Sequence, residues 1–175
     1  PVLKPAAAAG VGDGRCRAMI IDFEAVWRES MDILRAGMYS VKAKAEIIAI
    51  GLQESRFEHR RQMNNGPAMG FWQFEQGGGV RGVLNHTQTK RIAEALCARF
   101  NIEASVIPTW SALEHNDVLA CCFARLLLLT APWPLPGPDD PDEGWRQYEW
   151  CWRPGKPHRE TWDEFYTQAW ELVSA

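Results

Sequence analysis

The sequence predicts a mostly α-helical domain with a small irregular or β-like insert after its second helix. Apolar residues recur at helical spacing along much of the chain, and Gly and Pro cluster between those stretches. The 175 residues suffice for one domain with a sizeable core. A hydrophobic fraction of 46% excludes disorder as the bulk state.

The chain begins with a segment that predicts no packed structure. Residues 1–15 are small and rich in Ala and Gly, so we expect a flexible tail or linker there and a folded domain over residues 16–175. This start lacks the continuous apolar run of a signal peptide, which predicts synthesis in the cytoplasm. From about Cys16 to Gly37 the apolar positions, Ile20 among them, predict the first helix.

The second predicted helix, over about 41–54, is apolar on two sides. One stripe includes Ile48 and Leu52, and Glu54 continues the other stripe four residues beyond Ile50. A helix with two apolar faces belongs in the centre of a domain.

The rest of the chain alternates between loops and helices. Residues 55–87 are glycine-rich and predict loops, with Phe71–Phe74 as a short extended piece, and the prolines of residues 131–141 break the helical pattern. Further helices are predicted over about 92–100, 118–131, 145–152 and 161–173, with Asn116 and capping boxes at Ser111–Glu114 and Thr161–Glu164 as start signals.

Composition excludes several classes of protein. A net charge of −3 gives no electrostatic signature for nucleic acid or anionic membrane. The apolar stretch 118–131 is too short to span a bilayer and contains Arg125, so we expect a buried helix and no membrane insertion. The five cysteines form no Cys-x-x-Cys pair and predict buried thiols. Nine tryptophans indicate either an aromatic-rich core or rings in a groove suited to sugars.

Glu54 is the first candidate for chemistry. Burial disfavours a charged carboxylate and raises its pKa, which keeps the group protonated and able to act as a general acid near neutral pH. The alternative is an exposed Glu at a helix end, paired with Arg56 or Arg60.

Two neighbouring segments resemble motifs of the soluble lytic transglycosylases and goose-type lysozymes. The first is Ile47–Phe57 (IIAIGLQESRF), an apolar helix that ends in Glu-Ser followed by an aromatic residue. The second is Gly66–Phe74 (GPAMGFWQF), similar to the family's Gly-Ala-x-Gly-Leu-Met-Gln. Their order and separation also match, over about 30 residues. The resemblance implies a lysozyme-like fold and cleavage of peptidoglycan, in a protein of phage or prophage type.

The resemblance also implies roles by position. Glu54 would be the catalytic acid and base, and Ser55 would hydrogen-bond near the reacting sugar. Gln73 would contact the substrate, and Gly70 would allow the chain to approach it closely. Phe71-Trp72 stands here in place of the family's Leu-Met, which suggests a reshaped groove with Trp72 as a sugar platform.

The family's later Ala-Tyr-Asn-Ala-Gly segment, whose Tyr hydrogen-bonds the catalytic Glu, is absent. Tyr148 is the nearest substitute, or else a core aromatic. Arg153 and Lys156 are candidates for binding the acidic peptide stem or lactyl groups, or else form a solvated turn.

The chemistry depends on a second carboxylate. Lysozyme-type hydrolases use a partner carboxylate as nucleophile or to activate water. Lytic transglycosylases of the resembled family use one Glu and form an anhydro product. Glu75, close after Gln73, is the candidate partner, with Glu58 as another. The one-Glu mechanism is favoured because no second carboxylate lies in a recognisable motif.

Other signals are set aside. Residues 77–82 match Gly-x-Gly-x-x-Gly, but no preceding strand is predicted, so a pliant loop leading to a helix beside the groove is expected instead of a dinucleotide site. The four histidines form no metal-binding motif. We expect no metal and no cofactor.

The expected partner is therefore the peptidoglycan glycan strand, acted on by a monomer in the cell wall during phage lysis or from within a virion. A non-catalytic binding or structural module that keeps the lysozyme-like fold is the alternative.

Overall fold

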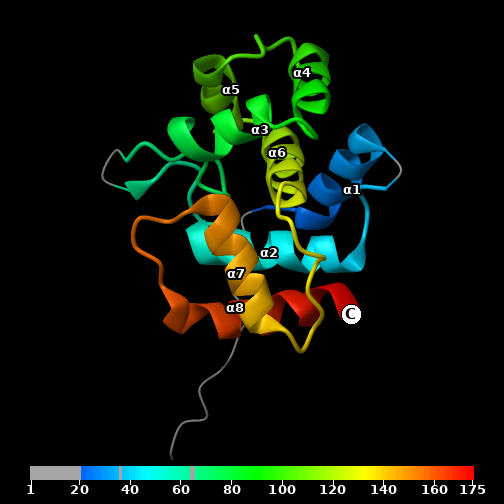
Figure 1. Ribbon diagram of the computed structural model, residues 1–175, viewed down its shortest axis with the longest axis vertical. Coiled ribbons are helices and arrows are strands. Elements are labelled where there is room, and N and C mark those ends of the chain that lie inside the picture. Colours follow the sequence, from blue (N-terminus) through cyan, green and yellow to red (C-terminus); the bar gives the residue numbers. More distant parts are fainter. Residues whose placement is uncertain (1–20, 36, 64–65) are drawn as a thin grey trace, which may run out of the picture.

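The computed structural model describes residues 21–35, 37–63 and 66–175, and it is mostly helical, as the sequence predicted (Figure 1). The predicted tail, Cys16 and Ile20 lie outside the described residues. The helices are α1 (Phe23–Leu34), α2 (Val41–Ser55), the π-helical turn η2 (Gln76–Val80), α3 (Arg81–Asn85), α4 (Lys90–Arg99), α5 (Val106–Leu113), α6 (Asp117–Leu129), α7 (Pro141–Trp152) and α8 (Arg159–Ser174).

Helix α2 lies at the centre, as its two apolar faces predicted. Ser40 caps its first turn by accepting a hydrogen bond of 2.9 Å from Ala43 N–H, and nearly all its residues from Ala43 to Leu52 are buried. Helix α8 runs along one side of α2, and α7 crosses in front of the pair (Figure 1). The last turn of α2, which contains Glu54, therefore lies near the C-terminal half of the chain.

Helix α6 is the buried helix expected from the apolar stretch 118–131. Asn116 caps it by accepting a hydrogen bond of 2.9 Å from Leu119 N–H, as predicted. Arg125 on this helix is buried, and its Nε–H donates a hydrogen bond to Met38 O at 2.8 Å, which compensates for the loss of water around the charge. None of the described helices is long and apolar enough to cross a membrane.

Both predicted capping boxes are wrong. Ser111 lies inside α5, which begins at Val106. Helix α8 begins at Arg159, and the Thr161 hydroxyl lies 3.1 Å from Gln53 Oε1 and 3.0 Å from His158 O instead of capping. In each case the helix extends further toward the N-terminus than the side-chain pattern indicated.

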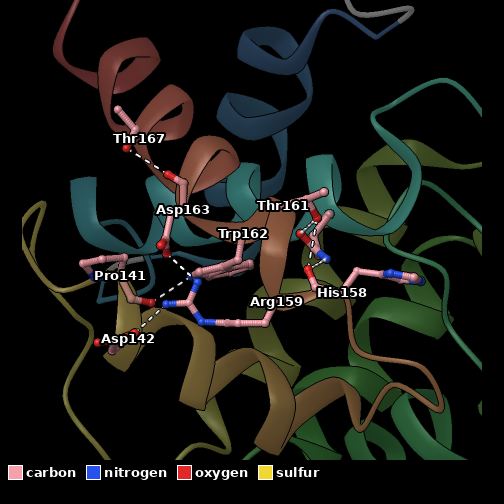
Figure 2. Close-up of polar contacts among 9 residues, drawn as sticks. Pro141, Asp142, His158, Arg159, Thr161, Trp162, Asp163 and Thr167 are labelled. Atoms are coloured by element: carbon pink, nitrogen blue, oxygen red, sulfur yellow. Dashed lines mark hydrogen bonds and ion pairs between the residues drawn. The ribbon is translucent and has the colours of Figure 1, made fainter.

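Helix α8 begins where its first turn is fixed to α7. Arg159 pairs with Asp142 at the start of α7 and with Asp163 one turn along α8, and Trp162 donates its indole N–H to Pro141 O at 2.8 Å (Figure 2). His158, just before α8, lies beside α2, because Gln53 Nε2 donates to its carbonyl oxygen at 3.0 Å.

Residues 55–87 are only partly loop. Residues 56–63 and 66–75 are irregular, with isolated antiparallel bridges from Met69 to Arg61 and to Phe74. Phe71–Phe74 is a turn and not an extended piece, because Gly70 (φ 73°) and Gln73 (φ 48°) are both left-handed. The pliant loop expected at residues 77–82 is wrong: this segment is helical, in η2 and α3. The described part of the chain contains no strand before this segment.

The described cysteines support the prediction of buried thiols. Cys97, Cys121, Cys122 and Cys151 are free and buried. Burial raises the pKa of the Cys121 and Cys122 thiols, so these groups stay protonated and act as small apolar side chains.

Candidate functional site

A cleft of about 760 Å³ opens beside the last turn of α2. It is bounded by the irregular segment of residues 56–63 and 66–75, by η2, and by the end of α7 with the loop that follows. Predicted site residues that line it are Glu54, Ser55, Gln73, Glu75, Tyr148 and Arg153. Gly70 and Trp72 are not among its lining residues.

The Glu54 carboxyl group is partly buried at the wall of this cleft and receives a hydrogen bond from Tyr148. Tyr148 Oη donates to Glu54 Oε1 at 2.8 Å, which is the contact expected if this tyrosine replaces the one in the missing motif. Burial raises the pKa of Glu54 to about 7, the Tyr148 hydrogen bond lowers it, and the charge of Glu75 raises it. Glu54 is therefore a carboxylic acid poised to gain or lose a proton near neutral pH.

Tyr148 is held in place by aromatic packing on α7 and α8. Its ring stacks on Trp162 with centroids 5.3 Å apart and lies 5.2 Å from the ring of Trp145. Burial and the neighbouring Glu54 raise the pKa of the Tyr148 hydroxyl, so it stays protonated and remains a donor. The packing of two helices thus aims one hydroxyl at one carboxyl group.

The chain leaves α2 through two consecutive left-handed residues directly after Glu54 and Ser55. Arg56 has φ 53° and Phe57 has φ 54°, a costly conformation outside glycine. This bend returns the Phe57 ring onto Gly51, where an added Cβ would lie 2.1 Å from the ring. A glycine is therefore needed at position 51, since any larger side chain would displace the Phe57 ring. The contact between Gly51 and Phe57 holds the chain just after Glu54 against the end of α2.

Ser55 lines the cleft, but its predicted role needs correction. Its hydroxyl donates to Phe71 O at 2.6 Å and accepts from Phe57 N–H at 3.1 Å. Because its single proton is engaged within the protein, Ser55 joins the irregular segment to α2 and does not present a donor to a sugar.

Gly70 and Trp72 are corrected as well. Gly70 is buried, and a Cβ there would lie 2.7 Å from Leu113 O, so this glycine serves chain packing and not substrate approach. Trp72 is 0% exposed and donates its indole N–H to Ile47 O at 2.9 Å. A fully enclosed ring cannot stack on a sugar, so Trp72 is not a platform.

The irregular segment is nevertheless firmly attached around the cleft. Arg60 forms a bidentate ion pair with Asp117 at 2.9 and 2.7 Å, and Arg61 forms one with Glu114 at 3.0 and 2.7 Å. Trp152 at the end of α7 donates its indole N–H to Trp72 O at 2.8 Å. These contacts fix the backbone that presents Gln73 and Glu75.

Gln73 and Glu75 face the cleft from this segment. Gln73 Nε2 donates to Gly70 O at 2.8 Å, which orients its amide at the cleft surface. Glu75 is exposed, and its charge is close enough to raise the pKa of Glu54. The two carboxylates therefore line the same cleft.

Several cleft residues were not predicted from the sequence. The loop after α7 contributes Arg153 and Lys156, which were expected. The residues that were not expected are His158 from the same loop, Trp152 from α7, and His59 and Arg61 from the irregular segment. Gln53, beside Glu54 in the sequence, reaches across to donate to His158 O at 3.0 Å. Only Gln53 had a sequence signal, its place next to the proposed acid.

The described side chains include no group of three or more His, Cys, Asp or Glu residues arranged to hold a metal ion. No protein-family model, no curated protein and no solved structure matches this chain.

Proposed function

We propose that this protein cleaves the β-1,4 glycosidic bond between N-acetylmuramic acid and N-acetylglucosamine in peptidoglycan, with Glu54 as catalytic acid. The principal support is a partly buried carboxyl group with a pKa of about 7, hydrogen-bonded by Tyr148 at 2.8 Å and open to a cleft of about 760 Å³. The resemblance of Ile47–Phe57 and Gly66–Phe74 to the lytic transglycosylase motifs supplies the substrate class and the lysozyme-like fold.

In the favoured mechanism Glu54 works without a second carboxylate. Its proton passes to the glycosidic oxygen as the bond from that oxygen to muramyl C1 breaks. The resulting Glu54 carboxylate then accepts the proton of the muramyl C6 hydroxyl, whose oxygen bonds to C1 and closes a 1,6-anhydro ring. Glu54 ends protonated, no water is consumed, and the Tyr148 hydrogen bond stabilises the carboxylate between the two steps.

Hydrolysis is the alternative chemistry because Glu75 lies in the same cleft. A Glu75 carboxylate that activates water would give a reducing muramyl end in place of an anhydro end. The products distinguish the two reactions, and mass spectrometry of the released muropeptides identifies them.

A non-catalytic module is the second candidate function, because a cleft of this kind can also hold a glycan without cleaving it. Turbidity of a peptidoglycan suspension tests it, with the native protein and with Glu54→Gln. Glu94→Gln on α4 is the matched control, since it makes the same exchange at an exposed position outside the cleft.

Clearing by the native protein and by Glu94→Gln, but not by Glu54→Gln, is the expected result. Equal clearing by all three proteins would remove Glu54 from the mechanism. Clearing by none of them, with retained sedimentation onto peptidoglycan, would favour the binding module.

A further inference from the structure

A second pocket of about 420 Å³ lies next to the cleft, where the ends of α6 and α7 meet η2 and α3. Gly78 and Arg153 line both cavities, so the two are adjacent across η2. Of the residues to which the sequence assigned a role, only Arg153 lines this pocket, as a candidate for binding the acidic peptide stem or lactyl groups.

The glycines between the two cavities have no structural explanation. A Cβ on Gly77 or Gly78 would meet nothing within 4 Å, and neither residue is among those with positive φ. Gly79 differs, because a Cβ there would lie 2.7 Å from the Phe74 ring. Packing thus requires one of the three glycines, and the other two leave open space along the boundary between the cavities.

The charged side chains in the second pocket are cationic. Arg81 from α3 and Arg153 from the end of α7 line it, and no Asp or Glu is among its described lining residues. Two guanidinium groups favour a carboxylate or another anion, because each can donate two parallel hydrogen bonds.

An exposed aromatic ring completes the pocket. Trp150 is 47% exposed, and its ring lies 5.4 Å from Trp133 in an edge contact and 6.0 Å from the Arg153 guanidinium. An apolar ring beside cationic groups suits a ligand that combines carboxylates with aliphatic segments.

We propose that this second pocket binds the acidic peptide stem of the muramyl unit whose glycan chain occupies the cleft. The inference rests on the proposed function, because the stem is attached to the strand being cleaved and would cross the open boundary at Gly77 and Gly78. Stem carboxylates would pair with Arg81 and Arg153, and the aliphatic part of the stem would lie on Trp150. The pocket would make the enzyme prefer peptide-substituted glycan.

The test compares two substrates and two matched variants. Arg81→Gln changes the pocket, and Arg91→Gln, at an exposed position on α4 outside both cavities, is the control. Each protein is assayed on intact peptidoglycan and on glycan strands stripped of their stems by an amidase. Arg81→Gln is expected to lower kcat/KM about tenfold on the intact substrate, with no change on stripped strands. Arg91→Gln is expected to change neither.

A binding experiment separates this proposal from the proposed function. The free stem tripeptide Ala-γ-D-Glu-diaminopimelate is titrated into the native protein while NMR follows the Trp150 indole N–H. A saturable shift that weakens in Arg81→Gln supports the pocket even if the protein clears no peptidoglycan. No shift, or equal losses on both substrates, overturns the proposal while leaving Glu54 as the acid if clearing persists. A loss on both substrates in Trp150→Ala alone would identify a sugar platform instead.

Discussion

Helix α2 contains two carboxyl groups with raised pKa values, and they lie in different surroundings. Glu54, in the last turn, opens to the cleft and accepts a hydrogen bond from Tyr148. Glu46, about two turns earlier, is 1% exposed, and neither of its carboxyl oxygens has a hydrogen-bond partner among the described residues. Burial raises the pKa of Glu54 to about 7 and that of Glu46 to about 8.

The site of Glu46 lies between α2, α7 and α8. A Cβ on Gly144 of α7 would lie 3.1 Å from Glu46 Oε2 and 2.5 Å from the Tyr166 ring of α8, so α7 approaches at its glycine. Glu46 is not among the residues that line the cleft. The comparison shows that burial alone produces a raised pKa, whereas a catalytic acid also needs access to substrate and a group that orients it.

The largest expected effect is the loss of activity in Glu54→Gln. The glutamine keeps the size of the side chain and an oxygen that can accept from Tyr148, but it has no acidic proton to transfer. We expect the rate of peptidoglycan clearing to fall about 10²–10⁴-fold, the usual contribution of a general acid. The same exchange in Glu46→Gln is expected to leave clearing unchanged, and an equal loss in both variants would contradict the distinction between the two groups.

Glu46→Gln is expected to act on stability instead. The native state keeps Glu46 protonated up to a pH of about 8, whereas the unfolded chain releases this proton near the ordinary pKa of 4.5. The unfolded state therefore binds fewer protons between these values, and native stability falls as the pH rises through that window. The glutamine side chain of the variant does not titrate, so this loss disappears.

Urea unfolding at pH 5 and pH 8.5 measures the effect. The free energy of unfolding of Glu46→Gln, relative to the native protein, should shift in favour of the variant by a few kcal/mol between the two pH values, since each pKa unit corresponds to about 1.4 kcal/mol. A difference that does not change with pH would mean that Glu46 is not protonated in the native state at neutral pH.

Tyr148→Phe is expected to change the pH dependence of the reaction. The hydroxyl stabilises the charged form of Glu54, so its removal raises the pKa of Glu54 further and moves the alkaline limb of the pH–rate profile to higher pH. The rate at the optimum should fall about tenfold because the carboxyl group loses a charge-assisted hydrogen bond. Tyr166→Phe makes the same exchange outside the cleft, where the hydroxyl donates to Gly137 O at 2.7 Å, and should leave the limb in place.

Glu75→Gln should produce the smallest change, and in the opposite direction. Removing this neighbouring charge lowers the pKa of Glu54, so the alkaline limb moves to lower pH while the product stays anhydro. The pH–rate profile and the muropeptide masses are the measurements. Complete loss of clearing in Glu75→Gln would falsify the one-Glu mechanism and favour hydrolysis.

Most helices were predictable from the sequence because apolar spacing is a local property. The two stripes of α2, the buried α6 and its Asn116 cap were all found in this way. The errors concern the exact starts of helices, the segment 77–82, which is helical and not a loop, and the segment 70–74. In that last segment two left-handed residues, Gly70 and Gln73, make a turn that no simple pattern reports.

The direction of side chains in the irregular segment was not predictable. The similarity of residues 66–74 to a family motif suggested that Trp72 faces the substrate, yet its ring is enclosed and bonded to Ile47 O. Glu46 was missed altogether, because a single Glu between Ala45 and Ile47 does not indicate which helix will cover it.

The sequence by itself determined that α2 is a central helix and that Glu54 ends its apolar stripe, because helical periodicity places residues on faces without reference to the rest of the chain. Only the tertiary structure decided that Tyr148 reaches Glu54 across 94 positions of sequence and that Glu75 stands beside them. The physical reason is that a pKa and a hydrogen bond depend on desolvation and distance in space, which the packing of α7 and α8 against α2 sets.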